Sequence, residues 1–125
     1  MPYIIKVTDT FAAAHALKGY EGACERLHGH NFQVTVSVLS VGIDKNGISL
    51  DFKLLSRLLK GILDKLDHEN LNELGVFKER NATAENIAVY IAREIQPEIV
   101  ARGYKLADVT VDESARYSVT YVPET

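Results

Sequence analysis

Three of the four histidines in this 125-residue chain lie near its only cysteine, Cys24. His28 and His30 are separated by Gly29, and His15 comes earlier in the sequence. On an extended strand, residues two apart point to the same face, so these two rings can share one ion. Imidazole nitrogens are ligands that zinc prefers, and three of them leave a fourth coordination position open. The spacing predicts a catalytic zinc site at His15, His28 and His30.

Two other interpretations of this segment remain open. A His-x-His motif also occurs by chance, exposed to solvent or satisfied by its neighbours. Cys24 lies four residues before His28 and could be a fourth ligand, which would make the zinc site closed and structural. The combination of His15, Cys24 and the remaining histidine, His68, favours the catalytic interpretation.

Cys24 and His68 are the candidates for moving protons. A thiol near a dication and an imidazole ionises more readily, so Cys24 could act as a base, whereas a buried cysteine would only pack. His68 follows Asp67, and a carboxylate can orient a histidine that titrates near neutral pH. Because adjacent side chains seldom bond directly in extended backbone, we expect Asp67 to act through orientation or water, or to serve the loop alone.

Glu113 is a candidate for binding a ligand. It shares its parity with Val109 and Val111, which places a carboxylate at the end of an apolar strand face. Burying a carboxylate is costly unless it is paired. A ligand with two N–H donors, such as the amino-pyrimidinone edge of a pterin or guanine, would pair with it. Alternatively, the strand end frays and Glu113 is solvated.

Hydrophobic periodicity predicts the order β-β-α-α-β-β. The segments that alternate, or that are rich in β-branched residues, and are therefore predicted as strands are 3–11, 31–38, 109–113 and 117–121. Asp51 can cap a first helix whose leucines recur at helical spacing as far as Leu66. Thr83 can cap a second helix, which Pro97 should kink or shorten and Gly103 should end.

This order predicts one α+β domain over residues 1–125, an antiparallel sheet with both helices on one face. A net charge of −3 without a basic stripe disfavours nucleic acid as a partner. The sequence has no apolar run of membrane-spanning length and no signal-peptide pattern, so we expect a cytoplasmic protein with no membrane partner. A chain this short buries a limited share of its surface, so oligomerisation is a plausible way to gain burial.

With these residues identified, the chain resembles the 6-pyruvoyl-tetrahydropterin synthase family over nearly its whole length. It is most similar to the 6-carboxy-5,6,7,8-tetrahydropterin synthase branch of queuosine (7-deazaguanine) biosynthesis. The segments that carry the resemblance are 11–15 (FAAAH), 24–30 (CERLHGH), 50–52 (LDF), 66–68 (LDH), 71–72 (LN), 83–86 (TAEN) and 111–113 (VDE). The chain departs from the family mildly: Ala82 stands where proline is expected, and Ser114 where threonine is.

The resemblance implies a tunnelling fold (T-fold) whose sheets join into a barrel, in a homotrimer or homohexamer with active sites shared between subunits. It implies a zinc-dependent lyase that converts 7,8-dihydroneopterin triphosphate to 6-carboxytetrahydropterin, acetaldehyde and triphosphate. The implied roles of the site residues are zinc ligation by His15, His28 and His30, proton transfer by Cys24 and by His68 with Asp67, and substrate binding by Glu113 and Thr83. The alternatives are a 6-pyruvoyl-tetrahydropterin synthase, which eliminates triphosphate without releasing acetaldehyde, and a non-catalytic zinc- or pterin-binding module.

Overall fold

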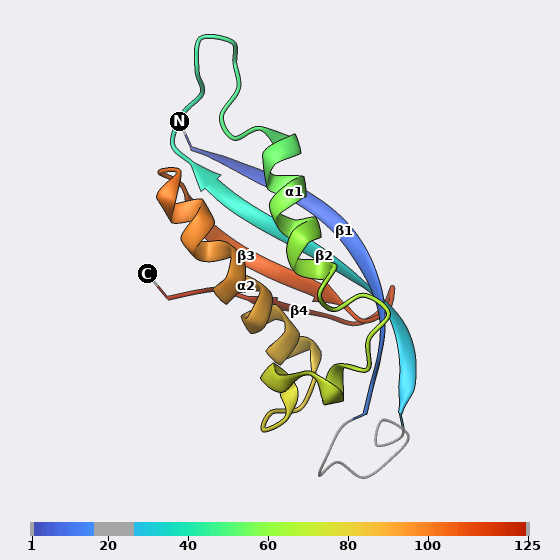
Figure 1. The fold of residues 1–125 in the computed structure, drawn as a ribbon. Helices are drawn as coiled ribbons and strands as arrows, with labels where there is room; N and C mark the ends of the chain where they lie inside the picture. Colours follow the sequence, from blue (N-terminus) through green and yellow to red (C-terminus); the bar gives the residue numbers. More distant parts are fainter. Residues whose placement is uncertain (1, 17–26, 125) are drawn as a thin grey trace.

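The computed structural model describes residues 2–16 and 27–124, so Cys24 lies outside the described residues. Within that part of the chain, one antiparallel sheet has the strand order β1-β2-β3-β4, and two helices cover one of its faces (Figure 1). The elements in chain order are β1 (Tyr3–His15), β2 (His28–Ser40), α1 (Phe52–Leu63), the short 3-10 helices Leu71–Glu73 and Gly75–Phe77, α2 (Ala84–Ala101), β3 (Lys105–Asp112) and β4 (Ser118–Tyr121). The predicted α+β class and element order are confirmed.

The core lies between the sheet and the helices. Alternate residues of β2 point toward the helices and are fully buried, which is the period-two pattern seen in the sequence. They pack against the apolar faces of α1 and α2. The fully buried members of this core include Phe32, Val34, Val36, Val38, Leu55, Leu59, Ile87, Ile91 and Ile95.

The first two strands are longer than predicted. β1 continues past Phe11 to His15, and β2 begins at His28, so that His15 pairs with His28 and Ala13 pairs with His30. His15 is therefore the last residue of β1, whereas the predicted strand ended at Phe11. Three consecutive alanines carry little strand propensity of their own. Pairing with β2 and burial of Ala13 keep this segment extended.

The helix ends follow the predicted caps. The Asp51 carboxylate accepts a hydrogen bond from the Lys53 amide at 2.9 Å, and the Thr83 hydroxyl accepts one from the Asn86 amide at 3.1 Å. α1 ends at Leu63, so Leu66 lies beyond the helix although it is fully buried. No helix among the described residues combines the length and apolar character that crossing a membrane requires.

Pro97 does not shorten α2, which continues to Ala101. The expected shortening was wrong, because Ile95 and Ile99, on either side of the proline, are fully buried and hold the helix against the sheet. Gly103 ends the helix as predicted, with a φ of 85°. The Gly103 amide donates to the Val100 carbonyl at 3.0 Å and the Tyr104 amide to the Ile99 carbonyl at 3.2 Å, which is the Schellman arrangement.

Two glycine substitutions test these helix assignments. Gly103→Ala should destabilise the protein by about 1–2 kcal/mol, because a Cβ disfavours the left-handed backbone. Gly61→Ala, at an exposed position in the last turn of α1 with no atom near the added Cβ, should stabilise it by up to about 1 kcal/mol. Urea unfolding measures both, and a Gly103→Ala protein as stable as wild type would contradict the assignment.

Candidate metal centre

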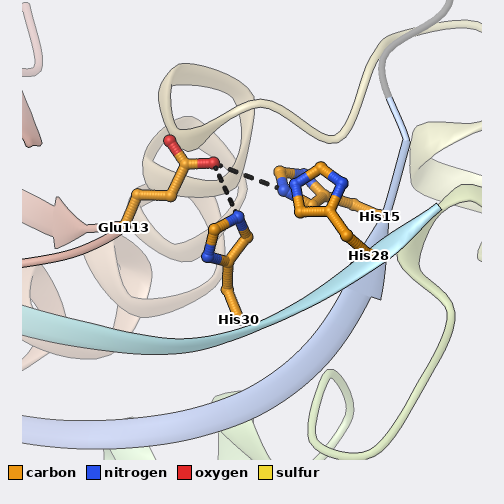
Figure 2. A group of neighbouring side chains, drawn as sticks. All are labelled: His15, His28, His30 and Glu113. Carbon is orange, nitrogen blue, oxygen red and sulfur yellow. Dashed lines mark ion pairs between the residues drawn. The ribbon is translucent and has the colours of Figure 1, made fainter. Parts of the chain in front are cut away.

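Three histidines and one glutamate meet at the end of the sheet where β1 finishes and β2 begins (Figure 2). One nitrogen or oxygen atom from each of His15, His28, His30 and Glu113 lies within 4.8 Å of the others. The ring centroids of His15 are 4.7 Å from those of His28 and 5.2 Å from those of His30, and the last two rings are 4.7 Å apart. The β1–β2 pairing creates this proximity, because it places His15 opposite His28.

His15 is the most buried member of the cluster, with 1% of its surface exposed. Its Nδ1 lies 2.6 Å from the backbone carbonyl oxygen of Ala82. A carbonyl oxygen only accepts hydrogen bonds, so Nδ1 carries the proton and donates it, and Nε2 presents a lone pair. That Nε2 is buried and has no hydrogen-bond partner among residues 2–16 and 27–124.

The carboxylate of Glu113 faces this lone pair. Its Oε1 lies 3.3 Å from Nε2 of His15 and 3.4 Å from Nε2 of His30. A carboxylate oxygen and an imidazole lone pair are both acceptors, and a buried acceptor without a donor is costly. Only a proton or a metal cation between them would satisfy both. Three imidazoles are a ligand set that catalytic zinc uses in proteins, so the histidines fit a metal ion with the Glu113 carboxylate beside it.

Burial lowers the pKa of His30, and the neighbouring rings of His15 and His28 lower it further, while the carboxylate of Glu113 acts in the opposite direction. A lowered pKa favours the neutral imidazole, which is the form that binds metals. The local electrostatics therefore keep the His30 nitrogen available as a ligand.

The contact of Glu113 with the histidines was not predicted from the sequence. Glu113 follows β3 directly, one residue past the strand end, and its amide still donates to the Tyr117 carbonyl at 3.0 Å. The β2–β3 register pairs Gln33 with Asp112. The following residue, Glu113, therefore lies beside the first residues of β2. The parity of Glu113 was the available signal, but the register that uses it comes from the sheet.

Asp67 and His68 lie outside the cluster and contact each other directly. Nδ1 of His68 is 2.9 Å from one carboxylate oxygen of Asp67, so the expectation of an indirect relationship was wrong. The reason is the backbone of His68, which has a φ of 61° instead of an extended value. The Ala12 amide donates to the other oxygen at 2.9 Å; this bond is the largest cause of a lowered Asp67 pKa, and the contact with His68 adds to it.

The His68 side chain is 82% exposed and is not a member of the histidine cluster. Even so, a pocket of about 450 Å³ has both His68 and His30 among its lining residues. Thr83 caps α2 with its hydroxyl and does not join the cluster, although its neighbour Ala82 supplies the carbonyl that holds His15. The structure thus assembles the predicted zinc ligands with Glu113 and leaves His68 and Thr83 outside.

Comparison with known proteins gives a consistent set of similarities. The sequence model of the 6-pyruvoyl tetrahydropterin synthase family matches residues 4–124. The chain is 35% identical over 123 residues to the 6-carboxy-5,6,7,8-tetrahydropterin synthase of Synechocystis sp., covering 92% of each chain. It is 41% identical over 87 residues to the dihydroneopterin monophosphate aldolase of Pyrococcus furiosus, covering 70% of this chain and 69% of that one. The solved structure of Caenorhabditis elegans 6-pyruvoyl tetrahydropterin synthase has a TM-score of 0.88 at 26% identity, covering 99% of this chain and 97% of that one.

The charge balance around His30 predicts a titration that can be measured. In the metal-free protein, NMR should show His30 titrating below the ordinary histidine pKa of about 6.5. Glu113→Gln should move the pKa lower still, because it removes the carboxylate that favours the charged ring. Glu98→Gln, which removes a carboxylate paired with Arg102 on α2, should leave it unchanged. A His30 pKa that rises in Glu113→Gln would contradict this account of the site.

Proposed function

Because the chain belongs to the 6-pyruvoyl tetrahydropterin synthase family, an enzyme family, we propose that it is a zinc-dependent lyase of queuosine biosynthesis. Its reaction converts 7,8-dihydroneopterin triphosphate to 6-carboxy-5,6,7,8-tetrahydropterin, with release of acetaldehyde and triphosphate. The observation that carries the proposal is the buried lone pair of His15, directed at His30 and Glu113. Similarity over 92% of the chain to a synthase of that name supports the choice of reaction.

In this proposal His15, His28 and His30 hold the zinc ion. When bound, zinc supplies Lewis-acid polarisation of the substrate's side-chain oxygens, which makes the adjacent C–H bonds more acidic. The protein fixes the ligand geometry in advance, since the Ala82 carbonyl sets the tautomer of His15 and the strand pairing sets the ring positions. A histidine whose tautomer and ring orientation are already fixed in the metal-free protein needs little rearrangement when the metal binds.

Glu113 anchors the pterin ring beside the metal. Its side chain is 33% exposed, and Figure 2 shows its second carboxylate oxygen pointing away from the histidine rings. A pterin presents two N–H groups on its amino-pyrimidinone edge, which a carboxylate can accept in a bidentate manner. The proximity of Glu113 to the histidines places the ring's side chain within reach of the metal. Thr83, at the start of α2, supplies a further polar contact to the substrate.

Cys24 and His68 transfer the protons, with Asp67 orienting His68. The ring of His68 is exposed and does not belong to the histidine cluster of its own chain. We propose that it completes the site of a neighbouring subunit, within an oligomer whose sheets join edge to edge into a barrel. The direct Asp67–His68 contact then holds the imidazole in one orientation at the subunit boundary.

A second candidate function is an aldolase acting on dihydroneopterin monophosphate. The identity of 41% to such an enzyme favours it, and the two reactions share the cleavage of a carbon–carbon bond in the pterin side chain. They differ in what is released. Aldol cleavage of the monophosphate leaves the phosphoryl group on the departing aldehyde, whereas the lyase releases acetaldehyde and free triphosphate.

Product analysis separates these functions. We expect the zinc-loaded protein, incubated with 7,8-dihydroneopterin triphosphate, to release acetaldehyde and triphosphate in equal amounts. Triphosphate without acetaldehyde would instead indicate a 6-pyruvoyl-tetrahydropterin synthase. Cleavage only of the monophosphate, with a phosphorylated aldehyde as product, would indicate the aldolase. Pterin binding without turnover of either compound would indicate a binding module.

Subunit complementation tests the shared site. Cys24→Ala and His68→Ala should each lower kcat at least about 100-fold, the usual loss when an acid–base residue is removed. Subunits of the two variants, dissociated and reassembled together, should recover about one quarter of wild-type activity, because random mixing places both intact residues in one site in four. Mixed oligomers without recovered activity would show that both residues come from one subunit.

A further inference from the structure

The outer edge of β1 is covered by a loop that ends beside His15. β1 is an edge strand, and the backbone groups of Ala12, Ala14 and Ala16 point away from β2. The segment 67–72 bonds to all three residues. Its contacts with the first two are the Ala12 amide to the Asp67 carboxylate at 2.9 Å, the His68 amide to the Ala12 carbonyl at 2.5 Å and the Ala14 amide to the Glu69 carbonyl at 3.0 Å.

Asn72 bonds to Ala16, the residue that follows His15. Its side-chain oxygen accepts from the Ala16 amide at 2.7 Å, and its side-chain nitrogen donates to the Ala16 carbonyl at 2.8 Å. One amide side chain therefore satisfies both backbone groups, as a neighbouring strand would. Asn72 is itself held, because its own amide donates to the Asn70 side chain at 3.1 Å.

Asn86 acts on the opposite side of His15, through the turn that precedes α2. Its side-chain nitrogen donates to the Asn81 carbonyl at 2.8 Å, and its amide donates to the Thr83 hydroxyl at 3.1 Å. These two bonds hold the residues on both sides of Ala82. The bond to Asn81 comes from the Asn86 side chain and is lost in Asn86→Ala, whereas the bond to Thr83 comes from the backbone amide and is kept. The Ala82 carbonyl, held between them, accepts the proton of His15 Nδ1.

We propose that Asn72 and Asn86 are positioning residues for His15: Asn72 fixes its backbone, and Asn86 fixes the carbonyl that sets its tautomer. Two separate elements thus converge on the one ligand whose Nε2 is buried without a hydrogen-bond partner. Residues that orient a metal ligand in this way typically change metal affinity 10- to 100-fold when they are replaced. The inference rests on the proposed metal site and is independent of which reaction the site catalyses.

Zinc affinity is the measurement that separates positioning from ordinary stabilisation. We expect Asn72→Ala and Asn86→Ala each to raise the zinc dissociation constant about 10- to 100-fold, measured by competition with a chromophoric chelator. The matched control is Tyr104→Phe, which removes a half-buried hydrogen bond of 3.1 Å to the Ser49 carbonyl in the loop before α1. It should lower the unfolding midpoint of the metal-free protein and leave zinc affinity within about twofold of wild type.

The tautomer of His15 gives a second readout. Nitrogen-15 NMR of the metal-free wild type should show a proton only on Nδ1, and Asn86→Ala should show a mixture of the two tautomers. If an alanine variant does not fold, Asn72→Ser or Asn86→Ser replaces it under the same criteria, because the hydroxyl is too short to reach the carbonyl. Zinc affinity unchanged in the asparagine variants, or lowered equally in Tyr104→Phe, would overturn the inference. A wild-type protein that binds no zinc would refute the metal site itself.

Discussion

The site depends on the lone pair of His15 Nε2, which the fold keeps unprotonated. The Ala82 carbonyl accepts a hydrogen bond from Nδ1 of His15. Nε2 of the same ring faces the Glu113 carboxylate and the imidazoles of His28 and His30. Such a set of acceptors is unfavourable unless a cation joins them. The strand pairing, the turn before α2 and the position of Glu113 each contribute to that arrangement.

The centre of the hydrophobic core and the histidine cluster lie in different parts of the sheet. The core fills the space between the helices and the middle of the sheet, where the exposed fractions of the inward-facing residues fall to zero. The histidine cluster lies at the end of the sheet, held by the loop 67–72 and the start of α2. Cap residues take part in both tasks, since Thr83 ends the turn that carries the Ala82 carbonyl and begins a helix that covers the sheet.

The related proteins include a synthase and an aldolase, and one type of metal site can support both reactions. A metal that polarises side-chain oxygens of a pterin favours loss of a proton nearby, and the fate of the resulting charge depends on the surrounding acids and bases. In the function proposed for this chain, those groups are Cys24, His68 and Asp67. In the oligomer proposed above, the exposed His68 would complete the site of a neighbouring subunit.

Much of this protein can be read from its residues. Period-two and helical spacing predicted the element order, and the His-x-His motif with His15 predicted a common site, because both patterns depend only on local geometry. The extension of β1 to His15, the left-handed backbone of His68 and the contact of Glu113 with the histidines were not predictable in this way. Each depends on a segment distant in the sequence: β2 for the alanines, the edge of β1 for the loop, and the β2–β3 register for the glutamate. Sequence determined which side chains were available for chemistry, and the sheet decided which of them face one another, because register and edge contacts come from pairing between distant segments.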